Sequence, residues 1–371
     1  MLKIAITGLP NVGKSTLFNA LTDGDALAAN YPFATIEPNT GIVPVPDSRL
    51  DVLAKMYKTD KIIPATVEFV DVAGLVAGAS KGEGLGNKFL ANIRQTDAIC
   101  HVVRAFESNK IQRADGTTTI DPQGDIEVIN TELALADVAT IETHLPKLQK
   151  EAKSNPKLRS KVNFLTSVQN DLLAGKRPSA FTDMSATELK EELDGLDLLT
   201  AKPVIYLFNV SENDLTNKDR QTELITMAAN ATGDDKNSIQ AVFICAELES
   251  EIRTLSEVEA AELLADYGVE ESGLNKLIRA AYSTLGLQSF LTAGPKEVRA
   301  WTIHKGWAAP QAAGVIHTDF ERGFIAAQVV SYDDLIACGS EAAARAAGKI
   351  RTEGKTYVMR DGDIVEFRFN V

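Results

Sequence analysis

The 371-residue sequence is poor in cysteine and histidine, with three and four residues respectively. Its cysteines, Cys100, Cys245 and Cys338, are far apart, and no histidines are paired at ligand spacing, so neither a disulfide framework nor a zinc site is expected. No apolar run approaches the roughly 18 residues of a membrane span, and the first residues enter an apolar strand without a signal peptide. We therefore expect a cytoplasmic protein with reduced thiols and no membrane contact.

Positive charge is also in deficit, because 38 lysines and arginines face 51 aspartates and glutamates, for a net charge of −13. This balance argues against a chain that coats nucleic acid with its whole surface. Basic residues nevertheless form one cluster, interrupted only by Glu151: Lys147, Lys150, Lys153, Lys157, Arg159 and Lys161. The cluster is either a solvated helix face or a patch that contacts phosphate groups.

The strongest feature of the sequence is a glycine-rich loop, Gly8-Leu9-Pro10-Asn11-Val12-Gly13-Lys14-Ser15, between an apolar run and the start of an amphipathic helix. A phosphate chain requires this order, because the loop bends its N–H groups around the anion and the helix N-terminus adds partial positive charge. We expect the catalytic Lys14 to contact the β- and γ-phosphates and Ser15 to bind Mg²⁺. The predicted phosphate-binding residues are Asn11, Val12, Gly13, Lys14, Ser15 and Thr16.

Two later segments are typical of a nucleotide-dependent switch. Thr35 lies in a proline-containing loop and is predicted to close onto Mg²⁺, and Asp71 follows a strand and is predicted to hold the metal through water. Gly74, three residues later, is the second predicted catalytic residue, since its N–H can contact the γ-phosphate. Leu75 stands where many switch GTPases have a water-orienting Gln, so we expect slow intrinsic hydrolysis or a group supplied from elsewhere.

The predicted base site follows the strand at 203–208 and reads Asn209-Val210-Ser211-Glu212. Guanine-specific sites carry Asn-Lys-x-Asp here, and the longer Glu212 is expected to lose the bidentate guanine contact, which adenine does not need. Cys245 and Ala246, after the strand at 241–244, are predicted to complete the base pocket. We therefore expect ATP to bind at least as well as GTP, and Val210→Lys combined with Glu212→Asp to shift the preference toward GTP.

The remaining segments are predicted to be structural. His101 lies inside a buried strand and is interpreted as a core residue rather than a catalytic one. The helical pattern at 125–199 predicts an inserted antiparallel arm that carries the basic cluster. From about residue 286, short strands and turns predict a small β-grasp-like module without catalytic groups.

Together, the phosphate loop, the segment from Asp71 to Leu75, the variant at 209–212 and the helical insertion resemble the YchF / Obg-like ATPase family of translation-factor-class P-loop NTPases. The resemblance covers essentially the whole chain, and its C-terminal region is similar to the TGS domain of that family. It implies ATPase activity with relaxed base choice, Mg²⁺ as cofactor, and association with the ribosome. Some relatives place a histidine in the loop after the His101 strand, where this chain offers only Arg113 as a substitute.

The predicted fold class is α/β: a P-loop NTPase with a Ras-like G domain and mainly parallel sheet, an inserted helical coiled-coil-like arm, and a C-terminal β-grasp (TGS) domain. The predicted domains are residues 1–130 with 200–285, residues 131–199, and residues 286–371. We expect a monomeric switch that hydrolyses ATP and binds the ribosome, through its large subunit or as a whole, and RNA, using the arm and the TGS module. A P-loop kinase acting on a small acceptor and a nucleotide-gated adaptor with negligible hydrolysis are the alternatives.

Overall fold

The structure, a computed structural model of the chain, describes residues 2–22, 39–72, 85–113, 116–178, 181, 184, 186–193 and 195–370. The chain forms two compact units, each assembled from two separate segments. The first unit comprises Met1–Gly41 and Glu68–Ala280, and the second comprises Ile42–Val67 and Ala281–Val371. Among the described helices, none is long and apolar enough to cross a membrane.

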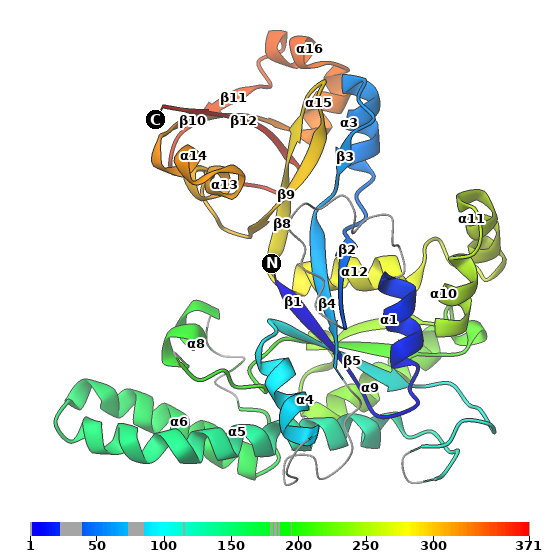
Figure 1. Ribbon diagram of the computed structural model, residues 1–371, viewed down its shortest axis with the longest axis vertical. Helices are drawn as coiled ribbons and strands as arrows, with labels where there is room; N and C mark the ends of the chain where they lie inside the picture. Colours follow the sequence, from blue (N-terminus) through cyan, green and yellow to red (C-terminus); the bar gives the residue numbers. More distant parts are fainter. Residues whose placement is uncertain are drawn as a thin grey trace. The chain divides into compact units, whose positions relative to one another are not determined.

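The sheet of the first unit has the strand order β2-β4-β1-β5-β6-β7 (Figure 1). Its strands are β1 (Lys3–Thr7), β2 (Thr40–Pro44), β4 (Thr66–Asp71), β5 (Ala98–Arg104), β6 (Val204–Asn209) and β7 (Gln240–Ile244). The strand pairs β1–β4, β1–β5, β5–β6 and β6–β7 are parallel, and all seven positions of β5 are buried, as expected for a strand covered on both faces. Parallel pairing brings the carboxyl ends of these strands to one edge, where ligands bind in such sheets.

Helices cover both faces of this sheet. The helices of the first unit are α1 (Lys14–Thr22), α4 (Leu85–Arg94), α5 (Pro122–Ala152), α6 (Arg159–Leu173), α8 (Ala186–Glu192), α9 (Lys218–Thr232), α10 (Ala246–Ile252), α11 (Glu257–Asp266) and α12 (Gly273–Thr284). Ile93 of α4 and Ile129 of α5 pack with Ile99 of β5 in one apolar cluster. Leu224 of α9 packs with Phe208 of β6 and Ile126 of α5 in an adjoining cluster, so α4, α5 and α9 cover one face. Helices α1 and α10, which contact each other, lie on the opposite side of the sheet (Figure 1).

The helical insertion is a hairpin of α5 and α6, joined by a short 3₁₀ turn at Pro156–Leu158 (Figure 1). Helix α5 begins at a favourable signal, because the side chain of Asp121 accepts a hydrogen bond from Gly124 N at 2.9 Å and Pro122 occupies the first turn. Its first half packs on the sheet, whereas Ile141 and Leu145 pack against Leu165 of α6. One continuous helix therefore belongs to both the nucleotide-binding core and the arm, and the predicted boundary at residue 131 falls inside it.

The second unit contains a mixed sheet, also of six strands, in the order β11-β10-β12-β8-β9-β3. Its strands are β3 (Ile62–Ile63), β8 (Leu287–Ala293), β9 (Val298–His304), β10 (Phe324–Ser331), β11 (Arg351–Glu353) and β12 (Asp363–Phe369). Its helices are α3 (Arg49–Tyr57), α13 (Ala309–Ile316), α14 (Thr318–Arg322), α15 (Tyr332–Cys338) and α16 (Glu341–Ala346). Phe290 of β8 and Val329 of β10 lie in an apolar core closed by Ala312 and Ala313 of α13.

The segment at 42–67 is part of this second unit, although the sequence analysis placed it in the nucleotide-binding domain. Strand β3 pairs with β9 in parallel, with Ile62 opposite Val298. Arg49 of α3 donates to Asp47 and to Asp361, each at 2.8 Å. The pairing of Ile62 with Val298 and the hydrogen bond from Arg49 to Asp361 join residues far apart in the sequence. The parallel sheet, the helical hairpin and the C-terminal sheet confirm the predicted fold class.

Candidate functional site

The glycine-rich loop joins the buried strand β1 to helix α1, as predicted, and two of its glycines are required by their surroundings. A Cβ on Gly8 would lie 2.6 Å from the carbonyl oxygen of Val102, so no larger residue fits there. Gly13 has a φ of +94°, a conformation that residues with a side chain rarely adopt, and a Cβ would lie 2.4 Å from the Asn209 amide nitrogen. The two glycines thus give the loop its shape.

This loop presents N–H groups in the way a phosphate site requires. From Asn11 to Gly13, no backbone N–H donates a hydrogen bond to another described residue. The first turn of α1 follows at Lys14, where the helix leaves further N–H groups without intrahelical partners. Ser15 and Thr16 are exposed on this turn. A row of N–H groups at the positive end of a helix is suited to an anion.

Lys14 points toward the end of the neighbouring strand β4. Its Nζ donates to the carbonyl oxygen of Val72 at 2.6 Å and lies 3.7 Å from Oδ1 of Asp71. The side chain of Lys14 is only 11% exposed, and burial lowers its pKa, while the charge of Asp71 opposes that shift. Burial likewise raises the pKa of Asp71. The loop lysine and the strand-end carboxylate, predicted from separate motifs, therefore lie side by side.

The same place suits Mg²⁺, which prefers oxygen ligands and usually takes only one or two from the protein in addition to substrate phosphates and water. Oδ1 of Asp71 is buried and has no hydrogen-bond partner among the described residues. The hydroxyl of Ser15 is exposed at the start of α1. These two oxygens fit the predicted metal site, whereas Thr35, Gly74 and Leu75 lie outside the described residues.

Asn209, at the end of β6, joins the phosphate loop to the segment after β7. Its Nδ2 donates to the carbonyl oxygen of Val12 at 3.0 Å, and its Oδ1 accepts from the N–H of Ala246 at 3.1 Å. All three residues are buried. The sequence analysis predicted that Asn209 reads the base; the structure adds a bracing role, with one amide hydrogen and one oxygen lone pair already used.

Val210 and Glu212 differ sharply in their surroundings. Val210 is 2% exposed and belongs to the apolar cluster around Phe208 and Leu224, so a lysine at this position would bury a charge in the core. The combined change Val210→Lys and Glu212→Asp is therefore a poor test of base choice. Glu212 begins a short 3₁₀ turn and is not buried, which leaves its carboxylate accessible.

Tyr267, which no sequence motif marks, is a neighbour of the predicted base residues. The negative charge of Glu212 is the main cause that raises the pKa of the Tyr267 hydroxyl. Burial raises the pKa of the Cys245 thiol, and the charge of Glu212 adds to that rise. Cys245 directly precedes α10, whose first N–H, from Ala246, is the one held by Asn209. Cys245 and Tyr267 are thus both close enough to Glu212 for its charge to affect their pKa, at the predicted base site.

The loop after β5 is held by side-chain hydrogen bonds from the buried Arg104 and from Asn11. Arg104 donates to the carbonyl oxygens of Phe106 at 3.2 Å and Ile111 at 3.0 Å, and the side chain of Asn11 donates to the carbonyl oxygen of Gln112 at 2.9 Å. Sequence reasoning missed these three hydrogen bonds, because no motif marks Arg104 or the carbonyl groups that accept them, although Asn11 belongs to the phosphate loop. Arg113 forms an ion pair with Asp125 of α5, which does not favour its role as a substitute for a catalytic histidine.

His101 has the core position that the sequence analysis predicted. Its ring is 1% exposed, lies 5.7 Å from the ring of Tyr206, and occupies the middle of the sheet. Burial lowers its pKa to about 3, so the ring is neutral at physiological pH. Its Nε2 has no hydrogen-bond partner among the described residues.

The fold and the site define a P-loop NTPase of the G-domain class. A family model described as "50S ribosome-binding GTPase" matches residues 3–117, and a model for the C-terminal region of YchF-type GTPases, described as "Protein of unknown function", matches residues 287–370. The chain is 53% identical to "Ribosome-binding ATPase YchF" of Haemophilus influenzae, covering 100% of this chain and 99% of that protein. It is 46% identical to "Obg-like ATPase 1" of Rattus norvegicus, covering 100% and 92%.

A solved structure gives the same result. The "Structure of the Schizosaccharomyces pombe YchF GTPase" matches with a TM-score of 0.85 and 40% identity, covering 99% of this chain and 97% of that chain. The chain therefore belongs to the YchF / Obg-like ATPase family, as the resemblance in its sequence predicted.

Proposed function

We propose that this chain is an Mg²⁺-dependent NTPase that binds ATP at least as well as GTP, hydrolyses it slowly and associates with the ribosome. The observation that carries the proposal is the position of Lys14, at the start of α1 and beside Asp71 at the end of β4. A cation from the phosphate loop and a metal-binding carboxylate at this spacing match the needs of phosphoryl transfer to water. The relatives "Ribosome-binding ATPase YchF" and "Obg-like ATPase 1" are named ATPases, and these names support nucleotide hydrolysis by this chain.

The proposed roles follow from this arrangement. Lys14 and the N–H groups from Asn11 to Thr16 hold the phosphates, and Gly74 contacts the γ-phosphate. Mg²⁺, when bound, neutralises charge on the β- and γ-phosphate oxygens. Ser15 would supply a protein oxygen to it, Asp71 would hold it through water, and Thr35 would add a second oxygen; the roles of Thr35 and Gly74 rest on the sequence alone.

Base choice is proposed to depend on Glu212. Guanine offers two adjacent donors, its N1–H and 2-amino group, to the carboxylate of an aspartate, and the extra methylene of Glu212 misplaces that partner. Adenine has no 2-amino group and loses nothing by the change. Val210, whose side chain is buried, stands where guanine-specific sites carry a lysine. The absence of that lysine supports relaxed base choice. Asn209, Cys245 and Ala246 line the same region.

The proposed partner is the ribosome, reached through RNA phosphates. Relatives of this chain are named ribosome-binding proteins. The end of the hairpin, residues 147–159, which we call the arm tip, comprises the last turns of α5, the turn and the start of α6 (Figure 1). It carries exposed cations: Lys147, Lys150, Lys153, Lys157 and Arg159. Concentrated positive charge on a protein with a net charge of −13 is suited to nucleic acid rather than to a solvated face alone. We also propose a cytoplasmic monomer and a contribution of the TGS-like second unit to RNA binding.

Nucleotide binding and turnover test the first part of the proposal. Fluorescent ATP and GTP analogues are titrated with Mg²⁺, and ATP hydrolysis is measured with and without ribosomes, with Lys14→Ala as the inactive control. We expect ATP to bind at least as tightly as GTP, and ribosomes to raise turnover. ATP binding without hydrolysis would favour the adaptor, and stimulation by a small phosphate acceptor would favour the kinase.

The arm tip is tested by paired charge reversals. Lys150→Glu with Lys153→Glu changes the tip, and Lys218→Glu with Lys236→Glu makes the same change in net charge on and near α9, where both lysines are exposed. Co-sedimentation with whole ribosomes and with large subunits should weaken about tenfold for the first pair only, and less so at higher salt. Equal effects of the two pairs would reject the arm tip as the contact.

A further inference from the structure

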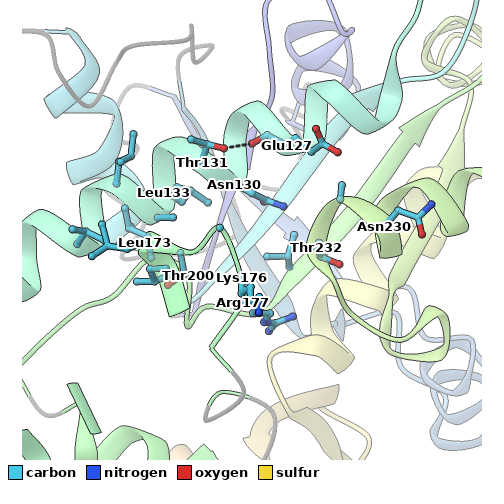
Figure 2. A pocket seen from close by; sticks show the side chains of 18 of the residues that line it. Glu127, Asn130, Thr131, Leu133, Leu173, Lys176, Arg177, Thr200, Asn230 and Thr232 are labelled. Carbon is cyan, nitrogen blue, oxygen red and sulfur yellow. Dashed lines mark hydrogen bonds between the residues drawn. The ribbon is translucent and has the colours of Figure 1, made fainter. Parts of the chain in front are cut away.

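The first unit contains a cavity of about 530 Å³ that the nucleotide site does not use (Figure 2). It lies at the root of the arm, between α5, the turn after α6, strand β6 and the end of α9. None of the described residues assigned above to nucleotide or metal binding lines it. Its volume falls within the range of roughly 300–1,000 Å³ that is typical of small-molecule sites.

One end of this root cavity is apolar. Its wall contains Leu133 and Val138 of α5, Leu172 and Leu173 at the end of α6, and Val204 of β6. Figure 2 shows Leu133 and Leu173 on the same side of the cavity, away from Arg177 and Thr232. Leu173 is 61% exposed, an unusual position for a leucine beside a hollow of this size. This end can remove the apolar body of a ligand from water.

The opposite end offers hydrogen-bond donors. The N–H of Lys176 donates to the carbonyl oxygen of Asp171 at 2.9 Å, and Gly175 has a φ of +69°, so the turn after α6 is fixed and brings Lys176 and Arg177 to the cavity. Nη1 of Arg177 is held by Asp234 at 2.7 Å, which leaves other guanidinium N–H groups for a ligand. Lys176 is exposed and forms no ion pair with any described residue.

The threonines of the cavity add acceptors rather than donors. The hydroxyl of Thr131 donates to the carbonyl oxygen of Glu127 at 2.7 Å, that of Thr200 to Oδ2 of Asp137 at 2.7 Å, and that of Thr232 to a carbonyl of its own helix at 3.0 Å. Their hydrogens are therefore used inside the protein. Asn130, Tyr206 and Asn230 also line the cavity and offer uncharged donors, and Glu127 is the one acidic residue among the described residues that line it. The cations of the lining are the basic pair at 176–177, which favours an acidic group at that end of the ligand.

We propose that the root cavity binds a small amphipathic anion, with an apolar body against the leucines and one terminal carboxylate on Lys176 and Arg177. An apolar wall together with Lys176, which has no ion pair among the described residues, is the complement of such a molecule. Because α5 and α6 both border the cavity, an occupant contacts the two helices of the arm at the point where they leave the sheet. The proposal does not depend on the nucleotide or on the ribosome.

Isothermal titration calorimetry of the full chain with dodecanoate, below its aggregation concentration, tests the site, with 1-dodecanol and dodecylamine as neutral and cationic probes of the same length. We expect saturable one-to-one binding of dodecanoate, weaker binding of dodecanol and none of the amine. Lys176→Glu should weaken dodecanoate about fivefold or more and leave dodecanol unchanged. Lys150→Glu at the arm tip makes the same change in charge and should have no effect.

Ala134→Phe provides a second variant, since Ala134 lines the cavity and a phenyl group there would occupy it. It should abolish binding of dodecanoate and dodecanol alike while leaving the circular dichroism spectrum and ATP binding unchanged. The proposal is overturned if dodecanoate does not bind, if Ala134→Phe still binds it, or if Lys176→Glu and Lys150→Glu weaken it equally.

Discussion

Replacing Asn209 with alanine would remove a side chain that joins the phosphate loop to the segment after β7. The substitution deletes the hydrogen bonds to the Val12 carbonyl at 3.0 Å and from the Ala246 N–H at 3.1 Å. Val12 and Ala246 are 3% and 6% exposed, so water has little access to the backbone groups left behind. Both groups would remain buried without a partner.

The expected cost follows from these two groups. A buried backbone group that loses its partner costs about 1–3 kcal/mol, so with two such groups the free energy of unfolding should fall by about 2–6 kcal/mol. That is a large share of the ~5–15 kcal/mol by which folded proteins are stable. Without the Asn209 hydrogen bonds, ATP binding would also have to order the phosphate loop. Each 1.4 kcal/mol of that free-energy cost weakens ATP affinity about tenfold. We expect ATP affinity to fall at least about tenfold.

Urea unfolding followed by circular dichroism measures the stability, and titration with a fluorescent ATP analogue measures the affinity. Asn163→Ala is the matched control, because Asn163 is exposed on α6 and alanine is the better helix former there. The control should unfold at the same urea concentration as the natural protein or slightly above it. An unchanged urea midpoint and an unchanged ATP affinity in Asn209→Ala would refute the bracing role.

Three further predictions concern pH, base choice and the second unit. Burial lowers the pKa of His101 to about 3, against 6.5 for the free group, so the unfolded chain binds a proton there below pH 6.5 that the folded protein does not. Stability should therefore fall by about 2 kcal/mol between pH 7 and pH 5, and His101→Phe should remove this part of the slope in urea titrations at both values. Glu212→Asp alone should shift the ratio of GTP to ATP affinity toward GTP in competition binding, and an unchanged ratio would contradict our account of the base site. Arg49→Leu deletes charged hydrogen bonds to Asp47 and Asp361 at 2.8 Å and should cost about 2 kcal/mol after allowance for partial exposure, read from tryptophan fluorescence, since both tryptophans lie in the second unit.

The sequence predicted those parts of the site whose geometry is determined locally. The phosphate loop was recognisable because its glycines, its lysine and the following helix are consecutive residues, and Asp71 because it ends a neighbouring parallel strand. The structure brings Lys14 and Asp71 together for this reason. The predicted roles of Thr35 and Gly74 stay predictions.

The parts that sequence reasoning missed depend on partners distant in the chain. The amide of Asn209 is 197 residues from Val12, so no local pattern reveals that it braces the loop. The burial of Val210 depends on packing against α9, whose residues lie outside the Asn209–Glu212 motif. The predicted domain boundary at residue 131 lies inside α5, because the apolar pattern of this helix continues through it. Residues of α5 pack both in the core of the sheet and in the core of the arm.

The second unit is assembled from two chain segments that are far apart in the sequence, and this affects how it folds during synthesis. Residues 42–67 leave the ribosome early, yet Arg49 finds its partner Asp361 312 positions later, and Ile62 pairs with Val298. At about 5–20 residues per second, tens of seconds of synthesis separate these partners. During that interval α3 and β3 have no native sheet to join, and the nascent chain carries an unpaired segment between two strands of the first sheet. The second unit is thus expected to fold only when synthesis is nearly complete.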